Sequence, residues 1–251
     1  MDNTMYVGLS KQILLQRELD IAANNLANVD TTGFKVESMV SASDDDNKAR
    51  TIGVTQPVKF AVDHGLARDF TQGALTKTGA PFDLAISGDG FFQVQTAAGM
   101  RYTRDGRFAV NAQSQLVTQA GDPVLDASGS PIAINPQGNT PVIGRDGTIT
   151  QTVAGQINSQ VVGKVGVVTF PNLSALSKEG DGTYSLSTNQ APTQSLNPVL
   201  QQGMLEGSNV NSVIQITDLI RIQRAYEMVS QMMTSTADLS ATAVQQLGSV
   251  Q

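Results

Sequence analysis

Few residues in this chain could take part in catalysis or bind a metal ion. His64, in the segment VDHGLAR, is the only histidine, and the sequence contains no cysteine. A Ser-His-Asp catalytic set would have to use this histidine, and the G-x-S-x-G motif that often presents the serine is absent. We therefore interpret His64 as a surface or turn residue. We predict no catalytic site and no metal site, so we do not expect an enzyme.

The consecutive aspartates Asp44–Asp46, in SASDDDNKAR, suggest a calcium site. An EF-hand loop needs alternating ligands, a central glycine and a distal glutamate, and this segment lacks that pattern. Gly88-Asp89-Gly90 is similar to the start of a dinucleotide-binding loop. However, Gln93 stands at the third glycine position, and a strand is expected there instead of a helix. We predict a solvated loop at the aspartates and no bound cofactor.

Other aspartates precede a glycine between alternating apolar and polar runs. Asp-Gly in that position is a strong signal for a β-hairpin, because both residues of the tight turn favour positive φ. A turn role therefore explains these aspartates without any chemistry. The pairs are Asp89-Gly90, Asp105-Gly106, Asp146-Gly147 and Asp181-Gly182.

The composition favours a turn-rich β protein of one large domain or two small ones. The charged fraction is 15%, aromatic residues make up 5%, and there are 23 glycines among 251 residues. A net charge of −6 without a visible basic patch argues against nucleic-acid binding. No apolar run reaches the roughly 18 residues of a membrane span, so we expect no membrane insertion. The N-terminus lacks the basic and apolar regions of a signal peptide, so we expect no export by an ordinary cleaved signal.

Residues 1–30 are predicted to form an N-terminal assembly helix. Its apolar residues recur at intervals of 4, 3, 4 and 3, the a/d rhythm of a helix that packs on another helix. The β-branched Thr31 and Thr32, followed by Gly33, are expected to end it. The seam consists of Leu15, Leu19, Ala22, Leu26 and Val29.

Three asparagines lie in this helix, although asparagine is a mediocre helix former. Asn24 and Asn28 are four residues apart and would share a helix face that is not the seam. We therefore predict that Asn24 and Asn28, together with Asn25, belong to a contact with neighbouring subunits.

The middle of the chain reads as a β domain between two connectors. Residues 31–80 are predicted to form an extended connector of low regularity. Residues 81–197 alternate in a β pattern, as in Phe82, Leu84 and Ile86, which indicates half-buried strands of an antiparallel domain. Residues 198–211 lead out of it as a return connector.

Residues 212–251 are predicted to form a C-terminal assembly helix, with Asn211 or Ser212 as N-cap. Its apolar residues form two adjacent seams, one containing Ile216, Leu219 and Tyr226 and the other containing Ile222 and Val229. This face is wider than a single helix contact requires, which indicates assembly. We expect the Leu15–Val29 seam to meet this helix within one subunit and its second seam to meet neighbouring subunits. The predicted class is thus α+β, with terminal helices paired as in a coiled coil around an inserted antiparallel β domain.

The two ends and the core of the sequence carry motifs of a known family. Ala23–Asn28 (ANNLAN) is followed by Thr32-Gly33-Phe34-Lys35, and Glu206–Val210 (EGSNV) is followed by Arg224–Glu227 (RAYE). Between them lie Leu84–Phe92 (LAISGDGFF) and Tyr102–Gly106 (YTRDG). These motifs resemble the flagellar basal-body rod and hook family. The opening Met1-Asp2-Asn3 and Tyr6-Val7, with the chain length, are most similar to the proximal rod members.

The resemblance implies a structural subunit of the bacterial flagellar rod, located in the basal body across the periplasm and exported by the flagellar type III apparatus without a cleaved signal. It implies that the terminal helices form the inner tube of a hollow drive shaft that transmits torque and passes export substrates. The implied partners are further copies of this chain, adjacent proximal and distal rod subunits, and the export apparatus. The alternatives are a distal rod protein of the same family and, in another class, a secreted β binding module or adhesin with coiled-coil ends.

Two sets of residues follow from the seams and the motifs. The candidate assembly interface comprises Leu15, Leu19, Ala22, Asn24, Asn25, Leu26, Asn28, Val29, Ile216, Leu219, Ile222, Tyr226, Val229, Met232, Met233, Leu239, Val244 and Leu247. The motif and turn residues are Thr32, Gly33, Phe34, Lys35, Gly88, Asp89, Gly90, Asp105, Gly106, Glu206, Gly207, Ser208 and Asn209.

Overall fold

The computed structural model describes residues 2–49, 58–153, 158–187 and 191–248, and the chain forms two compact units. Unit 1 consists of Met1–Ala27, Glu37–Asp69 and Asn211–Gln251, and unit 2 of Asn28–Val36 and Phe70–Val210. The chain therefore passes from one unit to the other four times. The predicted α+β class is confirmed, since both terminal segments are helical and antiparallel β structure lies between them.

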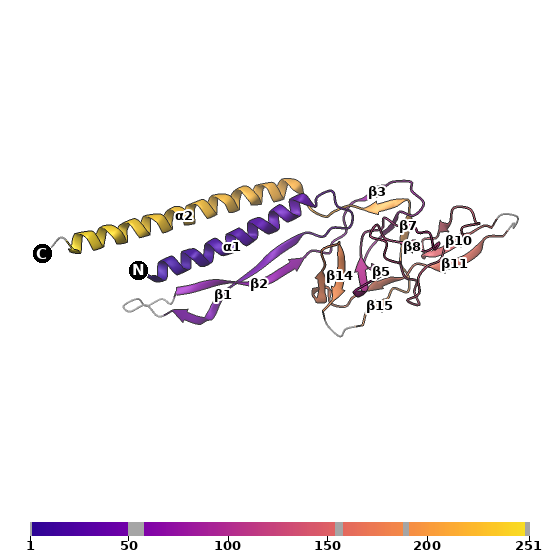
Figure 1. Cartoon of the computed structure of the whole chain (residues 1–251), viewed down its shortest axis with the longest axis horizontal. Helices are drawn as coiled ribbons and strands as arrows, with labels where there is room; N and C mark the ends of the chain where they lie inside the picture. Colours follow the sequence, from indigo (N-terminus) through magenta and orange to yellow (C-terminus); the bar gives the residue numbers. More distant parts are fainter. Residues whose placement is uncertain (1, 50–57, 154–157, 188–190, 249–251) are drawn as a thin grey trace. The chain divides into compact units, whose positions relative to one another are not determined.

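Unit 1 is built on helices α1 (Asp2–Ala27) and α2 (Ser212–Gly248), which lie side by side (Figure 1). The Asn211 side chain accepts hydrogen bonds from the backbone N–H groups of Val213 (3.1 Å) and Ile214 (3.3 Å), so Asn211 is the N-cap of α2. Helix α1 ends at Ala27, three residues before the predicted end. The chain then turns, with the Thr31 N–H donating to the Asn28 carbonyl (3.2 Å).

The two helices meet through one seam of α1 and the second seam of α2. Leu15, Ala22 and Ile222 form its buried centre. Leu19, Ala225 and Val229 pack around it. The expectation that the second seam of α2 faces neighbouring subunits is therefore wrong for Ile222 and Val229. The small side chain of Ala225 allows the two helices to approach each other closely. At the same level of α2, the first seam has the larger or polar residues Gln223, Tyr226 and Ser230.

Near the start of α1 the helices also approach each other closely. Gly8 is buried, and a Cβ added there would lie 2.8 Å from Cγ of Met233. A larger residue at position 8 would therefore push Met233 aside. Met233 belongs to the first seam, so both seams of α2 contribute to contacts with α1.

Unit 1 also contains a long antiparallel hairpin of β1 (Glu37–Ala49) and β2 (Val58–Arg68). Asp44–Asp46 lie within β1, so the prediction of a loop at these aspartates is wrong, and His64 lies in β2. Asp44 pairs with Phe60 of β2, and this backbone pairing overrides the weak strand preference of aspartate there. The pairing register shifts between Asp44 and Ala49. Residues 50–57 of the predicted connector lie outside the described residues.

Unit 2 is an array of short strands. A six-stranded antiparallel sheet has the order β13-β14-β6-β5-β12-β15, a three-stranded one β11-β10-β9, and β16-β4, β17-β3 and β7-β8 form pairs. The strands are β3 Leu75–Lys77, β4 Leu84–Ile86, β5 Phe91–Thr96, β6 Gly99–Thr103, β7 Ala109–Val110, β8 Leu116–Val117, β9 Val142–Ile143, β10 Thr148–Gln151, β11 Gln160–Lys164, β12 Val167–Thr169, β13 Leu176–Lys178, β14 Thr183–Leu186, β15 Thr193–Gln194, β16 Leu200–Gln202 and β17 Met204–Glu206, with a 3₁₀ turn η1 at Leu173–Ala175.

The core of unit 2 lies on both faces of β5. Phe92 joins an aliphatic cluster with Leu84, Ile86 and Leu200, while Phe91 joins an aromatic cluster on the opposite face. Leu84, Ala85 and Ile86 are all buried, so the prediction that β4 is half-buried is wrong at Ala85. A strand covered on both faces has no solvent side, and the small alanine fits where space is limited.

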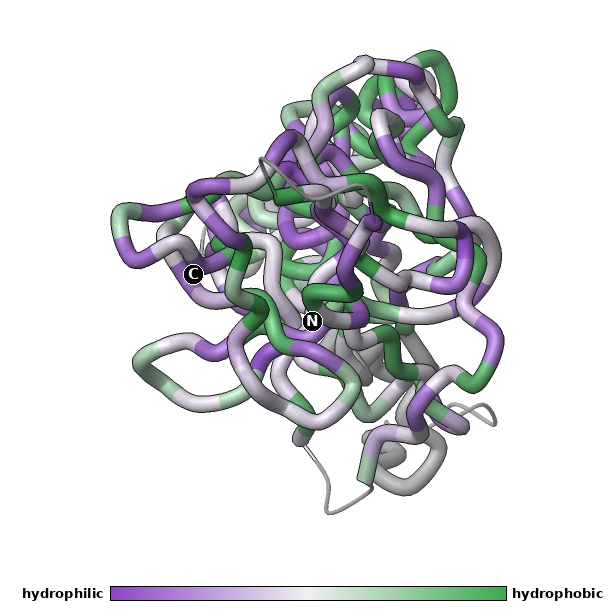
Figure 2. Tube along the Cα trace, turned by 90° about the vertical axis from the view of Figure 1, so that its right-hand side faces the viewer, coloured by the Kyte–Doolittle hydropathy of each residue, from purple (hydrophilic) through white to green (hydrophobic). Residues whose placement is uncertain are grey.

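Apolar stretches are short and alternate with polar ones along the trace (Figure 2). Among the residues that the structure describes, no helix combines the length and hydrophobicity needed to cross a membrane.

Two of the four Asp-Gly pairs form the predicted hairpin turns. Asp146-Gly147 joins β9 to β10 and Asp181-Gly182 joins β13 to β14. In both turns only the glycine has positive φ, +86° at Gly147 and +77° at Gly182, so the expectation of positive φ at both residues is wrong. Each aspartate instead accepts hydrogen bonds from the backbone and side chain of the threonine two residues later.

The other two pairs do not connect paired strands. After Asp105, a Cβ on Gly106 would overlap the carbonyl oxygen of Leu84, so this glycine is required for a close approach of two segments. Gly90, after Asp89, has φ +139° and packs against Val167. The sequence pattern was right about the need for glycine and wrong about its purpose.

We expect the free energy of unfolding of the double variant Asp146→Ala, Asp181→Ala to fall less steeply with decreasing pH than that of the wild type. Hydrogen bonds from Thr148 hold the pKa of Asp146 below its ordinary value, with a further contribution from Lys164. Burial alone would raise the pKa of Asp181, but hydrogen bonds from Thr183 outweigh it and lower that pKa too. Carboxylates with a lowered folded pKa stabilise above about pH 4 and lose this contribution as the pH falls through the folded pKa.

Urea denaturation between about pH 5 and pH 2, followed by circular dichroism, measures this difference as the slope of unfolding free energy against pH. Equal slopes for the wild type and the double variant would contradict the assignment.

Candidate functional site

The motif segments from the two ends of the chain lie side by side in unit 2. The Gly33 N–H donates to the carbonyl of Glu206 (2.8 Å), and the Asn209 N–H donates to the carbonyl of Phe34 (3.4 Å). The side-chain oxygen of Asn209 accepts from the Val36 N–H at 2.8 Å. Residues 32–36 and 206–209, which the sequence marked as two separate motifs, therefore form one structure.

A buried ion cluster holds these segments together. The Oε1 atom of Glu206 lies 2.5 Å from Nζ of Lys35, and its Oε2 lies 3.0 Å from Nη1 of Arg104. The three side chains are at most 3% exposed. Charges so far from water need partners in good geometry, and charge-assisted hydrogen bonds of this kind are the strong ones.

Backbone groups add further partners to this cluster, although Nε of Arg104 is buried without a hydrogen bond. Glu206 also accepts from the Gly73 N–H at 3.0 Å, and Lys35 donates to the carbonyl of Thr71 at 2.7 Å. Arg104 donates from Nη2 to the carbonyl of Gly88 at 2.9 Å. Its guanidinium carbon lies 5.2 Å from the ring centroid of Phe91, a cation–π distance. The cluster thus joins the terminal motifs to the segments around residues 71–73, 88 and 104.

Gly33 allows the N-terminal motif to reach this position. Its φ is +69°, and an added Cβ would lie 2.6 Å from the carbonyl carbon of Arg104. A side chain at residue 33 would therefore be strained by its backbone conformation and would collide with the segment that carries Arg104. Phe34, next in the motif, is buried, and the ammonium of Lys178 lies 4.0 Å from its ring centroid.

In unit 1, the buried Asn25 binds within its own chain. Its side-chain oxygen accepts from the Glu37 N–H at 3.0 Å, and its Nδ2 donates to the Glu37 carbonyl at 2.8 Å and to the Gln215 side chain at 3.2 Å. Asn25 therefore connects α1 to the starts of β1 and α2. This corrects the interpretation of its amide as one available to a neighbouring subunit.

The other two asparagines of the motif do not share a helix face. Asn24 is exposed on α1, whereas Asn28 follows the last residue of α1 and its side-chain oxygen accepts from the Thr31 hydroxyl at 3.1 Å. An asparagine beyond the helix end contributes to the turn. Contact of Asn24 with a neighbouring subunit remains a prediction.

Several residues of the predicted assembly interface on α2 are exposed in the single chain, since α1 covers only part of this helix. Leu219 and Met233 are half-buried, as are Leu26 and Val29 in the N-terminal segment. The exposed members are Ile216, Tyr226, Met232, Leu239 and Val244.

Sequence reasoning missed a third group of exposed apolar side chains on α2, which includes Val213, Ile220 and Met228. Their spacing of 7 and 8 residues places them along one stripe of the helix and could have identified them. On α1, Tyr6, Leu9 and Ile13 are exposed as well.

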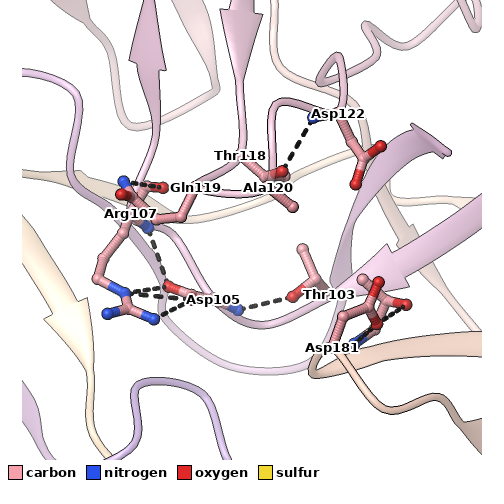
Figure 3. Close-up of a pocket in the computed structure, with 9 residues that line it drawn as sticks. Thr103, Asp105, Arg107, Thr118, Gln119, Ala120, Asp122 and Asp181 are labelled. Carbon is pink, nitrogen blue, oxygen red and sulfur yellow. Dashed lines mark hydrogen bonds and ion pairs between the residues drawn. The ribbon is translucent and has the colours of Figure 1, made fainter.

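A pocket on unit 2 is lined by acidic groups, two of which are engaged in local interactions (Figure 3). Asp105, Asp122 and Asp181 line it, and Arg107 forms an ion pair with Asp105 at 2.7 Å. The Asp181 carboxylate accepts from the Thr183 N–H and hydroxyl. Within the described residues, no three histidine, aspartate or glutamate side chains are grouped so that they could hold a metal ion.

Comparisons with known families match both ends and the core of the chain. The family described as "Flagella basal body rod protein" matches residues 5–35, and "Flagellar hook protein FlgE/F/G D1 domain" matches residues 85–151. "Flagellar basal body rod FlgEFG protein C-terminal" matches residues 201–246. The Lys35, Arg104 and Glu206 cluster takes one residue from each matched region.

Individual relatives are similar over their full length. The flagellar basal-body rod protein FlgF of Caulobacter vibrioides is 52% identical over 250 residues, covering 100% of both chains. FlgF of Mesorhizobium japonicum is 38% identical over 99% of each chain. The flagellar basal-body rod protein FlgG of Buchnera aphidicola subsp. Acyrthosiphon pisum is 36% identical over 92% of this chain and 94% of its own.

We expect Glu206→Gln to lower the free energy of unfolding by about 3–5 kcal/mol, because the buried cations Lys35 and Arg104 lose their counter-charge. Asp218→Asn is the matched control: it makes the same change from carboxylate to amide in the exposed ion pair with Arg221, which should be worth at most about 1 kcal/mol.

Urea denaturation of the two purified variants measures both effects. A loss of unfolding free energy of similar size in the two variants would show that the buried cluster stabilises the protein no more than the exposed ion pair does.

Proposed function

Because this chain belongs to the flagellar basal-body rod protein family, as a structural subunit of the rod in the flagellar basal body, we propose that it polymerises through α1 and α2 into the hollow shaft that transmits torque. Membership of this family favours a structural rather than a catalytic role. The full-length similarity to FlgF favours a proximal rod subunit over a distal one, and nothing in the comparisons favours a secreted adhesin.

One observation carries the assembly proposal. The contact between α1 and α2 is centred on Leu15, Ala22 and Ile222, and yet large apolar side chains remain exposed along α2 from Val213 to Val244. A stable monomer rarely exposes apolar residues along a whole helix, and such a surface marks a contact with another protein. Further copies of this chain and other rod subunits would cover it.

The end of α2 offers a second feature that fits a hollow shaft. After Glu227 the only charged side chain is Asp238, and the remaining polar residues are serine, threonine or glutamine. We place these neutral side chains on the lumen of the shaft, where they would let export substrates pass without electrostatic trapping. Export of this chain by the flagellar type III apparatus, without a cleaved signal, and a position across the periplasm belong to the same proposal.

Unit 1 and unit 2 would have separate tasks in such a shaft. Unit 1 would supply the helical contacts between subunits, since its buried centre is small and its exposed apolar surface is large. Unit 2 has two extensive buried clusters of its own and so would keep its shape when subunits assemble. Helices with little internal packing gain most of their stability from partners, which agrees with this division.

We expect Leu239→Glu to prevent rod assembly while leaving the fold of the isolated chain unchanged. Leu239 is 71% exposed on α2, so a charge there costs little in the monomer and much in a buried subunit contact. Val161→Glu is the control, because Val161 is 69% exposed on β11 of unit 2, which is not part of the proposed contact surface.

The measurement is swimming motility, together with electron microscopy of isolated basal bodies, in cells whose native subunit is replaced by each variant. Circular dichroism of the purified variants checks the fold. Complete rods in the Leu239→Glu strain would contradict the proposal that this face of α2 forms a contact between subunits.

A further inference from the structure

We propose that residues 199–210 are the closing segment of unit 2, and that this unit cannot reach its folded state until that segment is in place. The proposal concerns the folding of the chain and does not depend on the function proposed above. It rests on the number and kind of contacts that this short segment makes with earlier parts of the unit.

The closing segment provides the only strand partner of β4 among the described residues. Leu200, Gln201 and Gln202 of β16 pair with Ile86, Ala85 and Leu84. On either side of this ladder the Ser87 N–H donates to the Val199 carbonyl (2.7 Å) and the Gly203 N–H to the Asp83 carbonyl (2.8 Å). Without the segment, the backbone groups of the buried strand β4 would lose these partners, which is costly.

The segment also completes the aliphatic core. Leu200 is 1% exposed and belongs to the same cluster as Leu84, Phe92 and Ile149. Its removal would open a cavity among residues from β4, β5 and β10 and expose them to water. Because Phe92 belongs to the six-stranded sheet, the loss would reach strands that do not touch the segment.

Gln202 ties the segment to a third part of unit 2. Its side-chain oxygen accepts from the Ile143 N–H at 3.1 Å, and its Nε2 donates to the carbonyls of Pro81 and Pro141 at 2.8 and 2.9 Å. The Leu200 N–H donates to the Arg145 carbonyl at 2.8 Å. The β9–β10 turn and the segment before β4 are thus both bound to the closing segment.

Glu206 adds an electrostatic contribution to the closure of unit 2. Lys35 and Arg104 are both buried cations of unit 2, and Glu206 is the acidic partner that the ion pairs of the described residues give to each of them. Bringing the two cations into the interior before Glu206 arrives would bury them without the carboxylate that both of them contact. The rest of unit 2 therefore has an electrostatic reason to stay open.

The late position of the closing segment in the chain determines when unit 2 can fold. Lys35 and Glu206 are 171 residues apart in the sequence. A chain that becomes available from its N-terminus would therefore hold unit 2 open until the closing segment is present. The segment would thus delay the fold until both ends of unit 2 are available.

Hydrogen exchange on the full-length, unmodified protein, read by mass spectrometry, tests the proposal. If the segment closes the unit, the amides of Gly203 and Gly207 should exchange through the same opening as those of the β5–β6 ladder, with protection equal to within about threefold. Protection of the β5–β6 ladder more than about tenfold above that of Gly203 and Gly207 would overturn the proposal, since the sheet would then persist with the segment detached.

Two full-chain variants sharpen the test. Leu200→Ala should speed exchange throughout the β5–β6 ladder by at least about thirtyfold, because loss of the leucine destabilises the whole unit. Val161→Ala, the same kind of truncation at an exposed position, should leave the ladder unchanged. Faster exchange confined to β4 and β16 in Leu200→Ala would count against the proposal. If that variant does not fold, the measurement on the unmodified protein decides alone.

Discussion

The carboxylate of Glu206 lies between Lys35 and Arg104 in the interior of unit 2, with all three side chains almost completely removed from water. Burial of these charges is favourable only while the three remain together, and an apolar replacement could be equally stable. We therefore interpret the cluster as a device for register: it requires one alignment of residues 33–36 with residues 206–209. The path by which both ends of the chain leave unit 2 depends on that alignment.

Two asparagines extend the same principle to the backbone. Asn209 in unit 2 accepts from the Val36 N–H, and Asn25 in unit 1 accepts from the N–H of Glu37, the next residue. Val36 and Glu37 are the last residue of one unit's segment and the first of the other's. Where no neighbouring strand is available, a side-chain amide can accept a hydrogen bond from the backbone. The N–H groups at the point where the chain changes unit therefore keep a hydrogen-bond partner. Asn25 and Asn209 of the terminal motifs thus have an intramolecular role.

The two units differ in how they obtain stability. Unit 2 buries Leu84, Phe91 and Phe92 almost completely in two clusters that share strand β5. In unit 1 the buried apolar cluster between the helices is centred on Leu15, Ala22 and Ile222. Since hydrophobic burial is the main source of folding free energy, unit 2 can hold its structure alone, whereas unit 1 has much to gain from association. This difference supports the proposed division of tasks between the two units.

Local pattern in the sequence was sufficient for the α+β class, for both terminal helices and for the glycines at residues 147 and 182, because helix periodicity and turn preferences depend on neighbours in the chain. It left Asn211 and Ser212 as alternative N-caps, and the structure selects Asn211. The motifs were sufficient for the family. Only the tertiary structure decided that Ile222 rather than Tyr226 faces α1, that Asp44–Asp46 lie in a strand, and that Ala85 is buried. Likewise, nothing near Lys35 in the sequence indicates its partner, since Glu206 follows 171 residues later. Which distant groups meet is determined by packing and by the cost of burying charge, and neither has a local signature.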